Sequence, residues 1–307
     1  MVDDMNNIVN RTTLIHLFKA LCFFAFPAFL TLILSYTFQH KDGIRQYNTL
    51  AVKLKSDDVN AEPDNSLQII FYGDSECYGA FSPNILLSEF DISSYNCATS
   101  AQKLCDTYAI MYENFKTQTP KIVVLETNCI FRNTEDVGFD NDPIMKLMYN
   151  NIPAFTYHSD WKIYIRALMP HTHDTKRREN KGYMRRDTVI PYKGGEYMKA
   201  STKKEKISDE NLDYLEQIKS ICKENNTIFL LVSTPSSKNW NTPKHNAVLE
   251  WANDNNVDYV DLNLEKDINI DWSTDTKDGG DHLNHEGAKK TTKFIGEYLT
   301  EHYQLSK

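Results

Sequence analysis

Basic charge, glycine and proline are all scarce in this chain. Its 307 residues include 34 lysines and arginines against 42 aspartates and glutamates, which gives a formal net charge of −8. Nucleic-acid-binding proteins normally carry a basic face, so this charge argues against that class of partner. Only 11 glycines and 10 prolines are present and no self-similar period occurs, so wholesale disorder, a fibrous repeat and a solenoid are all disfavoured.

Paired cysteines are also missing, because the sequence contains no CxxC motif. Several of the six cysteines lie in apolar runs typical of strands or helices, where a cysteine is most often a small buried hydrophobe. We therefore expect neither a disulfide framework nor a zinc site. The cysteines are Cys22, Cys77, Cys97, Cys105, Cys129 and Cys222.

One uncharged apolar run lies near the N-terminus, at residues 20–38. As a helix rising about 1.5 Å per residue it approaches the roughly 30 Å thickness of a bilayer core. We interpret 20–38 as a transmembrane anchor with residues 1–19 in the cytoplasm, in preference to a buried core helix. A cleaved signal peptide is disfavoured because residues 35–37 make a poor cleavage site. Basic residues flank the run equally on both sides, so charge leaves the orientation open.

The rest of the chain predicts a linker followed by one α/β domain. Residues 39–66 are polar and patternless, which is typical of a linker. From 67 to 307, short apolar runs alternate with helical periodicity, which predicts about five parallel strands covered by helices on both faces. The expected strands are 67–72, a segment before Asn96, 121–126, 227–233 and 258–262. The expected helices are 82–90, 102–115, 209–224, 243–253 and 285–302.

An irregular segment at about 138–206 interrupts this rhythm. It carries aromatic and basic side chains and no clear period. We interpret it as a solvated insertion that packs on the edge of the sheet. The alternative is a lid or docking surface for an anionic or sugar-containing acceptor.

Polar residues after three expected strands point to acyl chemistry. Ser75, in Gly73-Asp74-Ser75, follows the first strand, where open α/β sheets place their active sites, and is a candidate nucleophile. A serine hydroxyl needs a base, and His282 lies among acidic residues just before the last helix. Residues 96–98 and 126–128 follow the second and third strands and could supply donors for an oxyanion.

The ordered set GDS, NxA, ETN and DxxxHLNxxG resembles the SGNH/GDSL hydrolase superfamily over 67–302, outside the insertion. The resemblance implies a flavodoxin-like three-layer α/β/α fold. It also implies that Ser75 is the nucleophile, His282 the base and Asn128 the side-chain donor of the oxyanion hole. Ala98 stands where the family has its marker glycine. The alanine keeps the backbone N–H that, together with the N–H of Ser75, is expected to bind the oxyanion.

The acid that orients His282 is less clearly marked, since position 279 is a glycine. Asp278 is favoured because the flexible Gly279-Gly280 pair allows it to fold back toward the imidazole. Asp281 stays open as the alternative. The remaining polar neighbours are interpreted as bystanders: Glu76 as a solvated residue at a helix start, and His285 as a supporting or helix-start residue.

The N-terminal anchor resembles the layout of the membrane-anchored branch of this superfamily, similar to alginate O-acetyltransferases and teichoic-acid D-alanylation proteins. That likeness implies an extracytoplasmic serine acyltransferase that takes an acyl donor and passes the acyl group to a glycan or cell-wall polymer. It also implies a multispanning membrane-bound O-acyltransferase as a partner. No cofactor or metal is expected. The alternatives are an SGNH carbohydrate esterase or deacetylase, and a non-catalytic polymer-binding scaffold.

Overall fold

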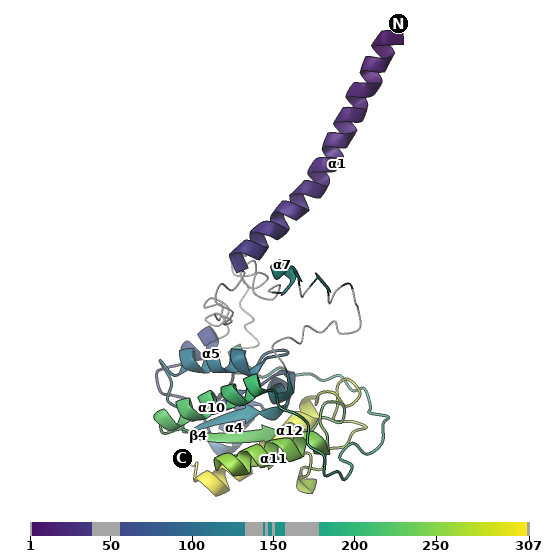
Figure 1. Ribbon diagram of the computed structural model, residues 1–307. Coiled ribbons are helices and arrows are strands. Elements are labelled where there is room, and N and C mark those ends of the chain that lie inside the picture. The colour runs from purple at the N-terminus through teal and green to yellow at the C-terminus, as the bar shows by residue number, and fades with distance from the viewer. Residues whose placement is uncertain are drawn as a thin grey trace. The chain divides into compact units, whose positions relative to one another are not determined.

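The computed structural model, drawn in Figure 1, describes residues 2–38, 56–132, 144, 147–148, 151–156 and 178–305. The chain divides into two units. One comprises Met1–Ala51 and Asp136–His171, and the other comprises Val52–Glu135 and Thr172–Lys307.

The first unit is built on helix α1, Val2–Phe38. Within it, Thr13–Thr37 has a mean hydropathy of 2.2 and is long and apolar enough to cross a membrane. The apolar window therefore begins earlier than the predicted anchor at 20–38. The short helix α7, Pro153–Thr156, belongs to the same unit, and the backbone N–H of Ala154 donates to Ser35 Oγ at 3.0 Å.

The second unit contains a five-stranded parallel sheet in the order β2-β1-β3-β4-β5. This is the flavodoxin-like order 2-1-3-4-5, so the predicted α/β class and strand count are confirmed. Four of the five strands are buried along nearly their whole length, as expected of a sheet covered on both faces. The strands are β1 Ile69–Tyr72, β2 Ser94–Asn96, β3 Ile122–Glu126, β4 Ile228–Ser233 and β5 Asp258–Asp261.

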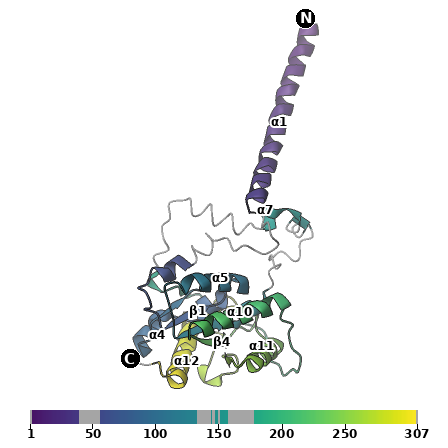
Figure 2. The same cartoon turned by 60° about the vertical axis from the view of Figure 1, so that its left-hand side comes forward.

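Helices form the two outer layers, as Figure 2 shows. Helices α5 and α10 pack together on one face, while α3, α4 and α12 pack on the other, and α11 contacts β5. Helix α10 begins where predicted, because Ser208 Oγ accepts from the N–H of Asn211 and caps the first turn. The helices are α3 Ser75–Ala80, α4 Pro83–Phe90, α5 Leu104–Asn114, α10 Asp209–Glu224, α11 Thr242–Asn255 and α12 His285–Tyr303, with 3-10 turns η1 Thr127–Phe131 and η2 Lys266–Ile268.

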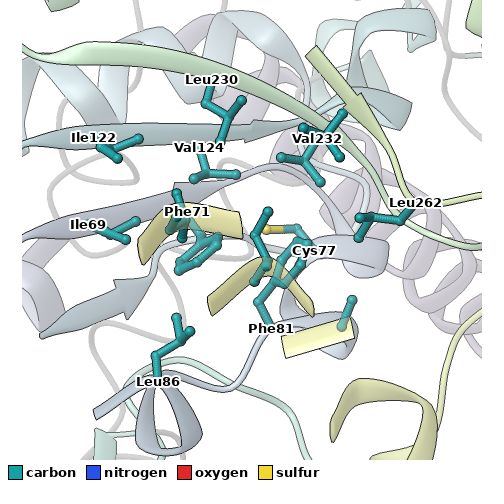
Figure 3. Packing of buried hydrophobic residues seen from close by; sticks show 14 of the residues in the cluster. Ile69, Phe71, Cys77, Phe81, Leu86, Ile122, Val124, Leu230, Val232 and Leu262 are labelled. Atoms are coloured by element: carbon teal, nitrogen blue, oxygen red, sulfur yellow. The ribbon is translucent and has the colours of Figure 1, made fainter. Parts of the chain in front are cut away.

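Alternate strand residues build the core beneath α3, α4 and α12. Phe71, Val124 and Val232 are fully buried there, together with Cys77 of α3, as Figure 3 shows. Each such apolar side chain stabilises the fold by about 1.5–3 kcal/mol. All five cysteines outside α1 are buried and free, which agrees with their interpretation as packing residues.

The domain extends further toward the N-terminus than predicted. Residues 56–60 are helical, Val59 is fully buried, and Glu62 pairs with Lys181 at 2.7 Å. The prediction of a linker over 39–66 is therefore corrected at 56–66. These residues belong to the domain, because Val59 is buried in it and Glu62 pairs with Lys181. Residues 39–55 lie outside the described residues.

The last part of the predicted insertion, 178–206, is described and makes two kinds of contact. At its start, the carbonyl of Lys181 accepts from the N–H of Asn96, on the edge strand β2, as a packing insertion would. Further along, the N–H of Ile190 donates to the carbonyl of Thr276, and the carbonyl of Ile190 accepts from Gly279. The segment therefore also packs against the loop before α12. The rest of the predicted insertion falls largely outside the described residues.

Candidate active site

Ser75 lies at a sharp turn between β1 and α3. The turn passes through Gly73, whose φ is +150°, and a Cβ placed there would lie 2.6 Å from Glu126 Cβ. A glycine is therefore required on steric grounds. Asp74 caps the helix, since its Oδ1 accepts from the N–H of Glu76 at 3.1 Å. The turn leaves Ser75 partly exposed at the carboxyl edge of the sheet.

His282 and Asp278 complete a hydrogen-bond chain with this serine. The two residues lie on the loop 276–284 before α12, hereafter the catalytic loop. His282 Nε2 is 2.8 Å from Ser75 Oγ, and His282 Nδ1 is 2.7 Å from Asp278 Oδ2. These distances meet the requirement for a nucleophile, a base and an orienting acid in line.

The catalytic loop folds so that Asp278, and not Asp281, makes the closer contact. Gly279 and Gly280 have φ of +76° and +95°, which lets the chain turn back on itself. Asp278 Oδ1 then accepts from the backbone N–H of His282 at 2.8 Å, while Asp281 Oδ1 is 3.4 Å from Nδ1. Partial burial opposes ionisation of Asp278, but these donors and Lys277 outweigh it, so its pKa lies below the usual value.

Two of the predicted oxyanion donors, Asn128 and Ala98, donate to side-chain oxygens inside the protein. Asn128, in η1, is almost fully buried and its Nδ2 donates to Asp74 Oδ2 at 3.0 Å. Ala98 is fully buried and its N–H donates to Asn96 Oδ1 at 3.3 Å. The N–H expected to hold an oxyanion is therefore engaged inside the protein. The structure brings Ser75, His282 and Asp278 together but gives Ala98 a different hydrogen-bond partner.

Glu76 is not the solvated residue that the sequence suggested. It is 3% exposed, and its Oε2 lies 3.1 Å from Ser75 Oγ. Together with Asp74 and Glu126, which are 0% and 1% exposed, it forms a group that we call the buried carboxyl cluster. The expectation of a solvated Glu76 is therefore corrected, because its side chain is buried against Ser75 and accepts from Asn239.

The members of the buried carboxyl cluster differ in charge state. Burial opposes ionisation of Asp74, but hydrogen bonding with Glu76 and the ion pair with Arg132, at 2.6 Å, lower its pKa below the usual value. Burial and the neighbouring charge of Asp74 raise the pKa of Glu76 well above its ordinary value, and they do the same for Glu126. Asp74 therefore carries the negative charge of the cluster, while both glutamates are driven toward the neutral form.

Three further residues at the site were missed from the sequence, namely Arg132, Asn239 and Lys244. Lys244 Nζ donates to Asn128 Oδ1 at 3.3 Å, which turns the Asn128 amide so that its NH₂ group faces Asp74. Burial lowers the pKa of Lys244. The amide Nδ2 of Asn239 donates to both Glu76 and Asp281. Asn239 and Lys244 follow β4, and Arg132 follows β3. Because sites gather at the carboxyl ends of parallel strands, this position was the signal in the sequence that could have pointed to them.

One group of potential metal ligands occurs among the described residues. Ligand atoms of Glu76, Asp281 and His282 lie within 4.8 Å of one another. However, Asn239 bridges the two carboxylates, and the imidazole nitrogens face Ser75 and Asp278. The potential ligand atoms of these three residues are therefore engaged in hydrogen bonds around Ser75 and His282.

Comparisons with known proteins give structural likeness alone. No family model matches the chain, and no curated protein matches it. Among solved structures, a GDSL-like lipase from Bacteroides thetaiotaomicron is similar with 13% identity and a TM-score of 0.42, covering 82% of this chain and 98% of that chain. A lipase/acylhydrolase from Enterococcus faecalis shares 11% identity, with a TM-score of 0.40 and coverage of 76% and 96%. A Clostridium thermocellum family 3 carbohydrate esterase shares 14% identity, with a TM-score of 0.40 and coverage of 76% and 96%.

At these identities and scores the likenesses do not assign an activity.

Proposed function

We propose that this protein is an SGNH-type serine hydrolase or acyltransferase in which Ser75 is the nucleophile. The observation that carries the proposal is the continuous chain from Ser75 Oγ through His282 to Asp278, with links of 2.8 and 2.7 Å. A non-catalytic scaffold has no need for such a chain at a partly exposed serine.

The geometry supports a two-step acyl transfer. Ser75 Oγ attacks the acyl carbonyl carbon while its proton passes to His282 Nε2, and the leaving alcohol then takes that proton as its C–O bond breaks. An acceptor hydroxyl next gives its proton to Nε2 and attacks the acyl carbon, and Nε2 returns that proton to Ser75 Oγ as the acyl C–Oγ bond breaks. The proposed oxyanion donors are the backbone N–H of Ser75 and the second N–H of the Asn128 amide, whose first N–H binds Asp74. Asp278 holds the imidazole and stabilises its charged form.

The finer proposal is that the enzyme is membrane-anchored and extracytoplasmic, and transfers an acetyl group to a glycan or cell-wall polymer. Helix α1 supports the anchor, because it is long and apolar enough to span a bilayer. An anchored domain acts on polymers at the membrane surface, where a multispanning O-acyltransferase would supply the acyl group as the partner. Esterase or deacetylase action is the alternative when water replaces the acceptor.

A pocket beside the catalytic loop supports a carbohydrate acceptor. Its volume is about 610 Å³, within the range of small-molecule sites, and polar and charged side chains share its wall with aromatic rings. Trp272 packs edge-on against Tyr192 and Tyr197, with centroids 6.1 and 5.6 Å apart. Tyr192 reaches the catalytic loop, since a Cβ on Gly280 would lie 2.8 Å from its ring. Aromatic faces that cover sugar C–H groups, beside side chains that bind hydroxyls, suit a sugar ring.

The decisive test compares the full-length protein in detergent with Ser75→Ala. We expect a fluorophosphonate probe to label the wild type, and p-nitrophenyl acetate hydrolysis to fall by at least about 10³-fold in the variant. Ser88→Ala is the matched control, since Ser88 is an exposed residue of α4 that bonds only Ile85 among described contacts. Equal activity in wild type and Ser75→Ala would reject the enzyme and favour the scaffold.

The acceptor is tested by adding cell-wall or exopolysaccharide oligosaccharides and reading the products by mass spectrometry. Ser75-dependent acetylated sugar would establish the transferase, and acetate release without a sugar product would favour the esterase. We expect Trp272→Leu to lower transfer to the oligosaccharide about tenfold while p-nitrophenyl acetate hydrolysis stays near the wild-type rate. An equal fall in both reactions would argue against the pocket as the acceptor site.

A further inference from the structure

The hydroxyl of Ser75 has two possible acceptors for its proton. His282 Nε2 is 2.8 Å away on one side, and Glu76 Oε2 is 3.1 Å away on the other. Glu76 Oε2 also lies 4.0 Å from His282 Nε2, so the carboxyl group stands beside the path of proton transfer. Only the hydrogen bond to His282 prepares the serine for attack.

The charge on Glu76 decides between these two acceptors. An ionised carboxylate accepts a charge-assisted hydrogen bond, which is roughly twice as strong as a neutral one, and would turn the Ser75 proton away from His282. The oxygen of a neutral carboxyl group is a much weaker acceptor than an imidazole nitrogen. A neutral Glu76 therefore leaves the proton directed at the base.

The surroundings of Glu76 favour its neutral form. The side chain is 3% exposed, and the ionised Asp74 adjoins it on the same turn. Arg132 compensates Asp74, at 2.6 Å, and no lysine or arginine forms an ion pair with Glu76 in the described part of the chain. A second negative charge at this position would be buried without a countercharge. The charged or titratable groups that face Glu76 from the surrounding elements are Asp74, Glu126, Arg132, Lys244, Asp281 and His282.

Asn239 holds the carboxyl group in this place. Its Nδ2 donates to Glu76 Oε1 and to Asp281, so the second oxygen, Oε2, is the one that remains directed at Ser75. The carbonyl of Asn239 accepts from Lys244 Nζ at 2.7 Å, which anchors the donor in turn. The contact between Glu76 and the nucleophile is thus supported from outside α3.

We propose that Glu76 is a catalytic residue that acts in its neutral form, and that its ionisation switches the site off by withdrawing the Ser75 proton from His282. This rests on the proposed function, in which Ser75 is the nucleophile. It adds a residue that the hydrogen-bond chain of Ser75, His282 and Asp278 does not include.

The test is the pH profile of the full-length protein and of Glu76→Gln in detergent, with p-nitrophenyl acetate as substrate. In the variant, Oε1 meets the Asn239 donor, so the new NH₂ group faces Ser75 Oγ and cannot take its proton. Each protein is compared with its own kcat at neutral pH. We expect the wild type to lose at least about tenfold of that activity toward alkaline pH, a loss that is absent from Glu76→Gln.

Glu126→Gln is the matched control, because Glu126 is buried in the same cluster and has no hydrogen bond to Ser75. We expect this variant to keep the alkaline loss. Its infrared spectrum should show the carbonyl band of a protonated carboxylic acid that disappears in parallel with activity, which tests the proposal even if Glu76→Gln does not fold.

The outcomes separate the inference from the proposed function. An alkaline loss confined to proteins that retain Glu76 supports the inference. If the wild type is active and Glu76→Gln follows the same pH profile, or if no protonated carboxyl band is found in Glu126→Gln, the role of Glu76 is rejected while Ser75 remains the nucleophile. If wild type and Ser75→Ala are equally inactive at every pH, both proposals fail.

Discussion

Carboxyl side chains lie on two sides of the Ser75–His282 pair, with Asp278 and Asp281 beside His282 and Glu76 beside Ser75, and the two groups differ in burial. On the catalytic loop, the side chains of Asp278 and Asp281 are 31% and 34% exposed. Asp278 also lies 3.0 Å from Lys277. The N–H and side-chain donors around Asp278 outweigh its partial burial and hold its pKa below the usual value, so this carboxylate stays charged.

The buried carboxyl cluster on the other side is nearly free of solvent and contains three carboxyl groups. Arg132 is the one arginine or lysine that forms an ion pair with the cluster among the described residues. Asp278 and Asp74 are kept charged by their donors and by Arg132, whereas Glu76 and Glu126 are driven toward the neutral form. Burial and the presence or absence of a countercharge therefore set the charge state of each carboxyl group.

The largest expected effect comes from removing the charge on the catalytic loop. In Asp278→Asn the imidazole loses the acceptor that orients it and stabilises its charged form, so we expect kcat to fall by about 10²–10⁴-fold. Steady-state kinetics with p-nitrophenyl acetate measure this. A loss below about fivefold would show that Asp278 is not the orienting acid.

Removing the countercharge of the buried carboxyl cluster should cost stability. Arg132→Met leaves Asp74 buried without its partner, and we expect the free energy of unfolding to fall by about 3 kcal/mol, because breaking a buried pair costs about 3–5 kcal/mol and the guanidinium is partly exposed. Urea unfolding followed by tryptophan fluorescence measures the change. Arg178→Met is the control, since its pair with Asp58 is more exposed and should contribute about 0–1 kcal/mol. Equal losses in the two variants would contradict the comparison.

Stability should also depend on pH through Glu126. Its folded-state pKa is raised above the ordinary 4.5, chiefly by burial and by Asp74, so its contribution is full below the unfolded pKa and is lost as pH rises through the folded pKa. We expect the wild type to lose stability across that window by up to about 1.4 kcal/mol per pH unit from this group. Glu126→Gln should show a smaller loss in urea unfolding at a series of pH values. An unchanged pH dependence would show that Glu126 is ionised in the folded protein.

The smallest effect is expected at Asp281. Its oxygen lies 3.4 Å from His282 Nδ1, against 2.7 Å for Asp278, and its main partner is the Asn239 amide. Asp281→Asn keeps an acceptor for that amide, so we expect kcat to change by less than about fivefold. A loss as large as that of Asp278→Asn would make the two aspartates equal partners of the base.

The elements of the fold could be predicted because their signals are local. Apolar runs at 121–126 and 227–233 became β3 and β4, and Ser208 marked the start of α10. The apolar run at 67–72 likewise placed Ser75 just after the end of a strand. The boundary at Leu67 was wrong because the pairing of Glu62 with Lys181 joins residues 119 positions apart.

The contacts around the nucleophile could not be predicted in the same way. Glu76 meets Asn239 across 163 positions, and Lys244 meets Asn128 across 116. No periodicity or motif in a single sequence reports such pairs. The expectation that Ala98 offers its N–H to an oxyanion rested on its place after β2 and on the resemblance, and the side chain of Asn96 takes that N–H in the structure.

The sequence by itself determined the order of strands and helices, the apolar helix at the N-terminus and the positions of the serine and histidine, since hydrophobic period and turn chemistry are properties of neighbouring residues. Only the tertiary structure decided which aspartate lies against His282, which way Asn128 is turned and that Glu76 faces the nucleophile. Those outcomes depend on burial and on charges that the fold brings together from distant parts of the chain, and the same forces set the charge state of each carboxyl group.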